Sequence, residues 1–198
     1  MVGNGRQAVT AARGSDSEAH ELDLVGRVAS GDQRAFEELY RCYHPRLWRF
    51  LDRVTRRPHL VEEVLNDTLL VVWRKPHTFN GECRLSTWIF AIAFNKAMKA
   101  LNRRDDPVEA NAAEELASEA LGPEGLVIQQ QSSARLLDAL AGLSIEQRAV
   151  VELTYFHGYA YREIAEVMSC PVDTVKTRMF HARRKLKVLL GTMHEDSA

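Results

Sequence analysis

Two helical patterns near the C-terminal end of the chain are separated by only two residues, Ser169 and Cys170, and this spacing restricts the possible folds more than any other feature. The first pattern is YREIAEVM, residues 161–168, and the second begins at Pro171. In the second pattern apolar residues recur at spacings of four, three and four, which is the helical period: Val175, Met179, Ala182 and Leu186. A helix of eight residues, a tight turn and a second helix predict a helix-turn-helix unit.

The outward face of the second helix is polar and basic, which suits a helix lying in the major groove of DNA. We expect its Thr, Phe and His side chains to meet base edges or thymine methyls, and its Lys and Arg side chains to contact phosphates or bases. The start of the preceding helix is expected to hold a phosphate. A basic face that is merely solvated is the alternative, but the regular inner stripe favours DNA. The predicted contacts are Tyr161, Arg162, Thr174, Lys176, Thr177, Arg178, Phe180, His181 and Arg184.

The stretch TWIFAIAFNKAMKALNRR, residues 87–104, has two unlike faces when it is wound as a helix. One face suits a protein core: Phe90, Phe94, Ala97, Met98 and Leu101. The opposite face has no acidic residue: Trp88, Ile92, Asn95, Lys96, Lys99 and Arg103. Single-stranded nucleic acid is held by such cations and flat rings. Trp88 has two equal interpretations, because a buried core aromatic would produce the same pattern.

Helical periodicity extends over most of the remaining chain. Apolar residues recur at three and four from residue 23 to residue 54, where Pro45 is predicted to kink or divide the helix. A further helix is predicted for residues 60–75. Ser86 is the predicted N-cap of the helix that contains residues 87–104. No segment has a convincing strand pattern.

Charge is segregated along the chain, although the formal net charge is only −1. Every charged residue from 105 to 134 is acidic, whereas every one from 174 to 187 is Lys or Arg, with His left aside. Such segregation of charge gives information about the binding partners of a protein rather than about its fold. We predict an all-α chain of two small helical domains, residues 21–104 and 132–190, joined by a flexible acidic linker at 105–131. The two ends, 1–20 and 191–198, are predicted to be tails, the first of them disordered.

Other classes of protein are disfavoured by composition. The longest apolar run, LLVVW at residues 69–73, is far shorter than the roughly 20 residues of a membrane helix, and no secretory signal is present. We therefore expect a cytoplasmic protein without membrane insertion. Cys42, Cys83 and Cys170 are expected to be reduced thiols, and no Cys or His spacing fits a zinc site. Without a nucleotide-binding or metalloprotease motif, we expect no metal, no other cofactor and no enzymatic activity.

Two stretches resemble one known family. Residues 144–187, which contain YREIAEVMSCPVDTVKTRMFHARRKLK, resemble region 4 of the bacterial sigma-70 family, in particular its extracytoplasmic-function (ECF) group. Residues 23–104 resemble region 2 of that group through AFEELYRCYHPRLWRF, VEEVLNDTLLVVWRK and FNGECRLSTWIFAIAFNKAMKAL. The resemblance implies a subunit that binds core RNA polymerase, reads the −35 promoter element through region 4, and recognises and opens the −10 element through region 2.

The resemblance also implies site residues in region 2. The loop of residues 79–85 would form a pocket for a flipped −10 base, and the implied −10 contacts are Phe79, Asn80, Trp88, Asn95, Lys96, Lys99, Arg103 and Arg104. The family grips the clamp helices of the polymerase β′ subunit with the helix at 60–75. The implied contacts there are Asp67, Leu70, Val71, Arg74 and Lys75, while Trp73 belongs to this surface or to the core. The polymerase β subunit, promoter DNA and an anti-sigma factor, which the family commonly has, are further implied partners.

The chain departs from the family pattern at a few positions. Asn66 stands where Gln is usual, and Ser169 and Cys170 replace the usual Gly-Ile of the helix-turn-helix turn. Loss of that Gly disfavours a left-handed backbone. The acidic linker is equally explained as a nucleic-acid mimic in a polymerase channel or as a solvated tether. Two rival functions are a free-standing helix-turn-helix regulator, which leaves the region 2 resemblance unexplained, and a nucleic-acid enzyme, for which no motif is present.

Overall fold

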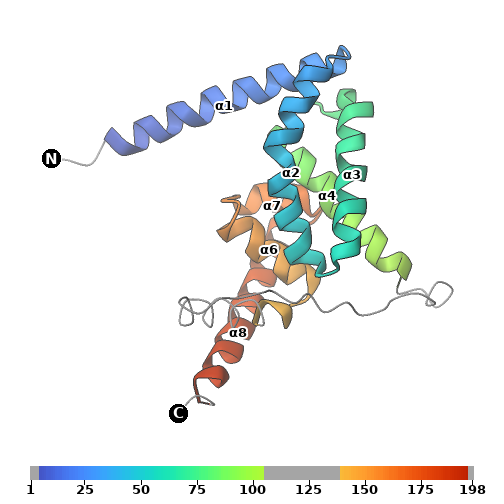
Figure 1. Ribbon diagram of the computed structural model, residues 1–198. Coiled ribbons are helices and arrows are strands. Elements are labelled where there is room, and N and C mark those ends of the chain that lie inside the picture. Colours follow the sequence, from blue (N-terminus) through green and yellow to red (C-terminus); the bar gives the residue numbers. More distant parts are fainter. Residues whose placement is uncertain (1–4, 105–138, 196–198) are drawn as a thin grey trace, which may run out of the picture. The chain divides into compact units, whose positions relative to one another are not determined.

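The computed structural model describes the backbone of residues 5–104 and 139–195 and the side chains of residues 17–103 and 139–190. Every regular element in these ranges is a helix, so the predicted all-α class is confirmed (Figure 1). The predicted linker, residues 105–131, lies outside the described residues. The elements are α1 (Gly5–Ala29), α2 (Gln33–Thr55), α3 (Pro58–Arg74), the 3₁₀ helix η1 (Pro76–Thr78), α4 (Leu85–Arg104), α6 (Ile145–Tyr155), α7 (Tyr161–Val167) and α8 (Val172–Glu195).

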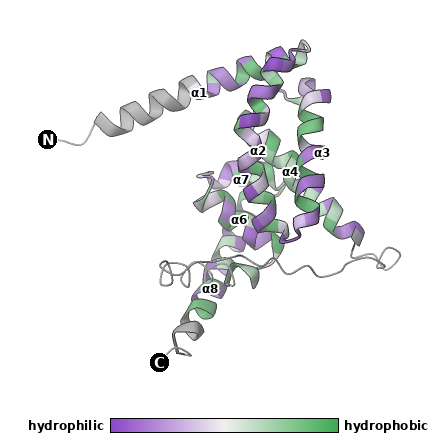
Figure 2. Ribbon diagram, viewed as in Figure 1, coloured by the Kyte–Doolittle hydropathy of each residue, from purple (hydrophilic) through white to green (hydrophobic). Residues whose placement is uncertain are grey.

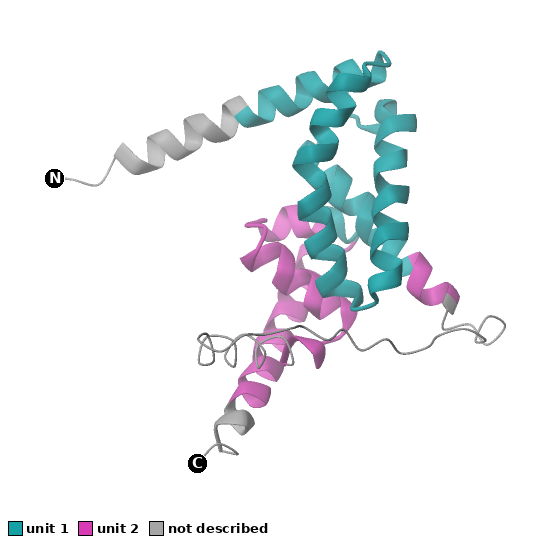
Figure 3. Cartoon of the chain, in the orientation of Figure 1, with its two compact units in different colours: residues 1–98, 166–169 teal, residues 99–165, 170–198 magenta. Residues whose placement is uncertain are grey.

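The chain divides into two compact units, as the prediction of two small helical domains requires (Figure 3). The first consists of residues 1–98 and 166–169, and the second of residues 99–165 and 170–198. Helices α1, α2 and α3 and most of α4 therefore belong to the first unit. Helices α6 and α8 and most of α7 belong to the second.

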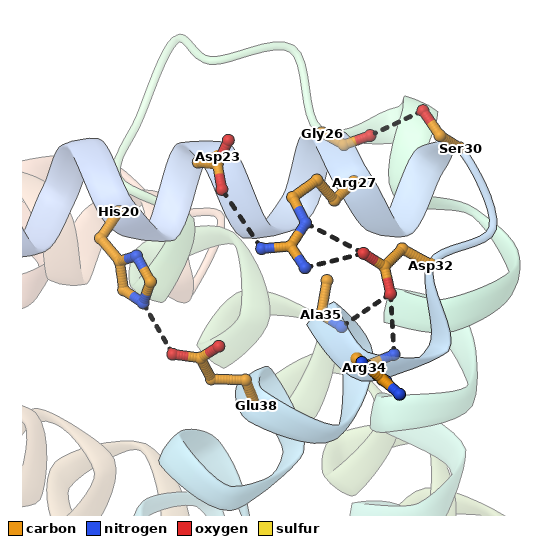
Figure 4. A network of polar contacts seen from close by, with 9 residues as sticks. All are labelled: His20, Asp23, Gly26, Arg27, Ser30, Asp32, Arg34, Ala35 and Glu38. Carbon is orange, nitrogen blue, oxygen red and sulfur yellow. Dashed lines mark hydrogen bonds and ion pairs between the residues drawn. The ribbon is translucent and has the colours of Figure 1, made fainter.

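Gly31 and Asp32 separate α1 from α2. Gly31 has a φ of +86°, which a residue without a Cβ adopts at little cost. Asp32 Oδ1 caps α2 by accepting hydrogen bonds from the backbone N–H groups of Arg34 (2.9 Å) and Ala35 (3.3 Å). Arg27 Nη2 donates to Asp32 Oδ2 at 2.7 Å (Figure 4). The hydrogen bond from Arg27 is the largest cause that lowers the pKa of Asp32 below its ordinary value.

Pro45 lies inside α2 and does not divide it, so of the two predicted outcomes, a kink or a division of the helix, the division is wrong. Its missing N–H and the clash of its ring cost a helix about 3 kcal/mol or more. The buried stripe nevertheless continues on both sides of it, with Tyr43 and Leu47 fully buried. The chain breaks at Gly31 instead, because the left-handed residue there and the Asp32 cap end one helix and start the next.

Helices α1 and α8 extend into the two segments that were predicted to be tails. Helix α1 begins at Gly5, and α8 ends at Glu195. The N-terminal tail was predicted from its content of Gly, Ala and Ser, but alanine has the highest intrinsic helix propensity. His20 Nε2 lies 2.8 Å from Glu38 Oε1 and so connects α1 with α2 (Figure 4).

The core of the first unit is formed by buried apolar residues of α1, α2, α3 and α4. Hydrophobic and hydrophilic residues alternate along these helices (Figure 2). The rings of Phe50 on α2 and Phe90 on α4 have centroids 5.2 Å apart. Helix α4 begins at Leu85, and the backbone N–H of Trp88 donates to the carbonyl of Arg84 at 3.1 Å. Ser86 therefore lies in the first turn of the helix, and the prediction that it is the N-cap is wrong. The buried residues of α3 are Leu60, Val61, Val64, Leu65, Thr68, Leu69 and Val72.

The second unit is built around α6, α7 and α8. Ser144 and Gln147 form a complete capping box, in which Ser144 Oγ accepts from the N–H of Gln147 and Gln147 Oε1 accepts from the N–H of Ser144. The buried guanidinium of Arg148 donates to the carbonyls of Leu140, Ala141 and Leu143. Arg148 thus fixes the segment before α6 by satisfying its carbonyl groups. The apolar core of this unit includes Ala149, Val150, Leu153, Ile164, Val175, Met179 and Ala182.

The turn between α7 and α8 is a Schellman motif. The N–H of Cys170 donates to the carbonyl of Ala165 at 3.0 Å, and the N–H of Ser169 donates to that of Glu166 at 3.2 Å. Ser169 has a φ of +49°. The left-handed conformation is therefore kept, although the Gly that usually provides it is replaced by Ser.

Candidate nucleic-acid interface

Helix α8 presents the two faces predicted for it. Val175, Met179 and Ala182 are buried, while Leu186 at the end of the stripe is half-buried. On the opposite face, Phe180 is 62% exposed and so presents an apolar ring to the solvent. The other exposed residues of the predicted DNA face are Lys176, Thr177, His181 and Arg184, and Thr174 and Arg178 are half-buried.

Local contacts orient several of these side chains. Lys176 Nζ lies 2.9 Å from Asp173 Oδ1, and Thr177 Oγ1 donates to the carbonyl of Asp173. The Phe180 and His181 rings have centroids 5.5 Å apart. Arg178 extends back toward the turn, where its Nη1 lies 3.5 Å from Cys170 Sγ.

The start of α7 is less suited to a phosphate than predicted. Arg162 is exposed and Tyr161 is half-buried. The backbone N–H of Ala160, however, already donates to Glu163 Oε2 at 2.8 Å. A carboxylate of the chain itself thus occupies part of the position predicted for an external anion.

Arg183 and Tyr155 form a contact that sequence patterns did not reveal. Arg183 donates to the Tyr155 hydroxyl from Nε (3.1 Å) and from Nη2 (2.8 Å). The pair joins α6 to α8 and is separated by 28 residues in the sequence. Helical periodicity relates residues on a single helix and therefore does not predict such a contact. Tyr155 itself is 59% exposed, and the adjacent Phe156 is 50% exposed.

Helix α4 also presents the two predicted faces. The core face is confirmed for Phe90, Phe94, Ala97 and Leu101, which are buried, and Met98 is half-buried. On the other face Asn95, Lys99 and Arg103 are exposed, Trp88, Ile92 and Lys96 are half-buried, and the side chain of Arg104 lies outside the described residues.

The loop before α4 brings Phe79 against Trp88. Their ring centroids are 5.5 Å apart and their planes are inclined at 50°. Asn80 Oδ1 accepts a hydrogen bond from the N–H of Glu82 at 3.1 Å, which turns the loop around Gly81 at φ +75°. Burial raises the pKa of the neighbouring Cys83 thiol. The structure thus places two predicted −10 residues, from different segments, in direct contact.

The outer face of α3 combines apolar and charged groups. Leu70 is 42% exposed, and Val71 is half-buried. Asp67, Arg74 and Lys75 are exposed. Trp73 packs on Phe36 of α2, with ring centroids 5.0 Å apart, which favours its interpretation as part of the core.

Asp67 joins this face to α4, because its Oδ2 lies 2.8 Å from Lys96 Nζ.

Within the described parts of the chain, no helix has the length and hydropathy needed to cross a membrane.

Comparison with known proteins identifies both units. Residues 39–106 match the family model of sigma-70 region 2, and residues 133–186 match that of sigma-70 region 4. The chain belongs to the sigma-70 family of RNA polymerase sigma factors. Over 173 residues it is 31% identical to the ECF RNA polymerase sigma-E factor of Escherichia coli (strain K12), a match that covers 82% of this chain and 90% of the relative. Within the family, the chain is a member of the ECF group.

Two further comparisons agree. The chain is 28% identical over 191 residues to the RNA polymerase sigma-H factor of Pseudomonas aeruginosa, covering 91% of this chain and 99% of that one. Among solved structures, the sigma factor RpoE from Bartonella quintana, in complex with the anti-sigma factor NepR, is similar with a TM-score of 0.64 and 26% identity. That match covers 79% of this chain and 96% of the other.

Proposed function

We propose that this chain is a promoter-specificity subunit: it binds core RNA polymerase, reads a −35 element as duplex DNA, and holds one strand of the −10 element after strand separation. It acts in the cytoplasm and catalyses no covalent chemistry of its own. The observation that carries the proposal is the pairing of two different surfaces on one chain. A basic helix-turn-helix face suits paired DNA, and an aromatic and basic face on α4 suits unpaired DNA.

The −35 element is read by α8. The major groove, about 12 Å wide, admits a helix, and the exposed ring of Phe180 offers apolar contact to a thymine methyl. Lys176 and Arg178 supply positive charge on the same helix for phosphates or guanine edges. Because this unit neutralises only a few phosphates, its binding alone is weak and sensitive to salt.

The −10 element is held by α4 and the loop before it. The Phe79 and Trp88 rings provide a surface on which a base stacks, with each stacked base worth roughly 1–3 kcal/mol. Extraction of a base from the duplex costs a few kcal/mol, so stacking of this size offsets the cost. Lys96, Lys99 and Arg103 contact the adjoining phosphates.

Polymerase is bound through α3. The exposed Leu70 side chain, bordered by Asp67 and Arg74, has the apolar centre and charged rim of a protein interface. The β′ clamp helices occupy this surface, and the β subunit is a second partner. The complex of the Bartonella quintana relative with an anti-sigma factor supports an anti-sigma partner for this chain as well.

The proposal is tested by run-off transcription with purified core polymerase over a promoter library. We expect new start sites that share −35 and −10 sequences. K176A/R178A should lose discrimination between intact and altered −35 elements, whereas R34A/R41A, which removes two exposed cations from α2, should retain it. A chain that leaves the start sites of core polymerase unchanged contradicts the proposal. Tight promoter binding at moderate salt without polymerase would support a free-standing regulator instead.

A further inference from the structure

The ion pair between Asp67 and Lys96 joins the helix proposed for polymerase to the helix proposed for DNA. Lys96 Nζ lies 2.8 Å from Asp67 Oδ2, and the Lys96 side chain is only 29% exposed. Partial burial reduces the solvent screening that makes fully exposed pairs weak. Among the residues that the structure describes, Lys99 and Arg103 on the same face of α4 form no ion pair. Lys96 is thus neutralised locally while its neighbours are available.

The pair opposes DNA binding at this position. A phosphate that approaches Lys96 carries the same sign of charge as the Asp67 carboxylate and competes with it for the ammonium group. Contact between Lys96 and DNA therefore requires that the pair be broken or shared. As long as Asp67 has no other cation, the free chain binds single strands less tightly than its basic residues would permit.

Asp67 is also accessible from the polymerase side. Its side chain is 56% exposed, and it lies one helical turn before Leu70. We propose that Asp67 exchanges cationic partners: it holds Lys96 in the free chain and is taken over by a basic group of the polymerase in the complex, which releases Lys96 to a DNA phosphate. This inference rests on the function proposed above. By linkage, polymerase and single-stranded DNA then strengthen each other's binding by the same factor.

The test compares D67N with E63Q in the full-length chain. Glu63 is exposed on α3, one turn before Asp67, and it has no ion pair with any described residue. Each substitution removes one negative charge from the same helix, so long-range electrostatic effects are matched, while only D67N frees Lys96. Binding of a short fluorescein-labelled DNA single strand is measured by anisotropy at low salt, and then over a series of salt concentrations.

We expect D67N to bind the strand about two- to fivefold more tightly than E63Q, as release of a partly exposed ion pair permits. The slope of log K against log salt should become steeper by about 0.7, since one more phosphate is neutralised. Both effects should vanish in a K96Q background. At saturating core polymerase the advantage of D67N over E63Q should also vanish, because polymerase has already taken Asp67 from Lys96.

The proposal is overturned by equal affinities of D67N and E63Q, by a gain that survives K96Q, or by a gain that persists with polymerase. A second measurement does not depend on DNA affinity. The acylation rate of the Lys96 amine in the free chain, followed by mass spectrometry, should rise in D67N and not in E63Q. Equal rates in the two variants would show that Asp67 does not hold Lys96 in the free chain, and the proposal would be rejected. Failure of the proposed function has a different signature, namely absence of transcription with core polymerase while these results on the free chain stand.

Discussion

The ring of Phe79 lies against the ring of Trp88, with centroids 5.5 Å apart and planes inclined at 50°. Phe79 belongs to the loop after η1, and Trp88 belongs to the first half of α4, so the contact fixes the loop on the helix. Both residues are half-buried. The geometry is that of a favourable tilted aromatic pair, and the exposed part of the rings is available for a third flat group.

W88A should impair strand separation at the −10 element. Loss of one stacking contact, worth roughly 1–3 kcal/mol, corresponds to a fall of about fivefold to a hundredfold in open complex formation. The fluorescence of 2-aminopurine placed in the −10 element measures this step directly, with polymerase binding monitored separately. W88F should retain most of the signal.

The matched control for this prediction is W48A. Trp48 is 42% exposed on α2, away from the Phe79 loop in sequence, and its removal deletes a ring of the same size from the same unit. Equal loss of open complexes in W48A and W88A would mean that the effect comes from general destabilisation. The specific role of Trp88 in stacking would then be rejected.

L70A should weaken association with core polymerase. Leu70 is 42% exposed between charged neighbours. The minority of interface residues whose truncation costs more than about 1 kcal/mol cluster near the centre of the interface, which is where we place Leu70. The expected result is a dissociation constant raised about tenfold in a titration of labelled chain with core enzyme. L22A is the matched control, because Leu22 is a similarly exposed leucine on α1. If L70A binds as tightly as L22A, α3 is not the polymerase surface.

The capped junction of α1 and α2 should respond to acid. The pKa of Asp32 is lowered from its ordinary value of 3.8, chiefly by the hydrogen bond from Arg27. A carboxyl group with a lowered folded-state pKa stabilises the fold above its unfolded pKa, and this stability is lost as the pH falls through the folded value. D32N keeps a good N-cap but loses the charge.

Urea denaturation at a series of pH values measures this effect. The difference in free energy of unfolding between the wild type and D32N should be constant near neutral pH and should shrink as the pH falls below 3.8. In an R27Q background the difference should be smaller at every pH above that value. A difference that grows toward acid pH would contradict the assigned role of the Arg27 hydrogen bond.

Local sequence patterns predicted the all-α class and the inner face of α8. The stripe of Val175, Met179 and Ala182 was predicted from spacing, because the helical period depends on interactions within a turn or two of helix. The break between α1 and α2 was not predicted, because helical periodicity extends from residue 23 to residue 54 and only Pro45 was expected to interrupt it. Proline is a strong signal in sequence, whereas the decisive residues, Gly31 and Asp32, act through a left-handed φ and a side-chain cap.

Contacts between helices could not be predicted in this way. Lys96 was assigned to DNA and Asp67 to polymerase, and no periodicity indicates that α3 and α4 bring them within 2.8 Å of each other. The contact of Arg183 with Tyr155 was missed for the same reason. The two candidate surfaces of region 2 were thus predicted as separate, although the tertiary fold couples them through one ion pair.

Ser169 offers a last prediction, because it occupies a left-handed position with φ +49° in the Schellman motif that ends α7. A residue with a Cβ pays about 1–2 kcal/mol to adopt this left-handed conformation, and Gly does not. Gly loses more conformational entropy on folding, which offsets part of this difference. S169G should therefore stabilise the turn by roughly 0.5–1 kcal/mol. Amide hydrogen exchange in α7 and α8 should slow about two- to fivefold, since each 1.4 kcal/mol corresponds to a factor of ten.

G31S provides the opposite test at the end of α1. Gly31 has φ +86° in an equivalent turn, where the N–H of Asp32 donates to the carbonyl of Arg27, and a Cβ there would meet no atom within 4 Å. Any loss of stability in G31S is then backbone strain rather than a steric clash, and exchange in α1 should become faster. G31S is expected to speed exchange, whereas S169G is expected to slow it. If both variants speed exchange, the Ser169 hydroxyl makes a stabilising interaction that outweighs the backbone strain at that position.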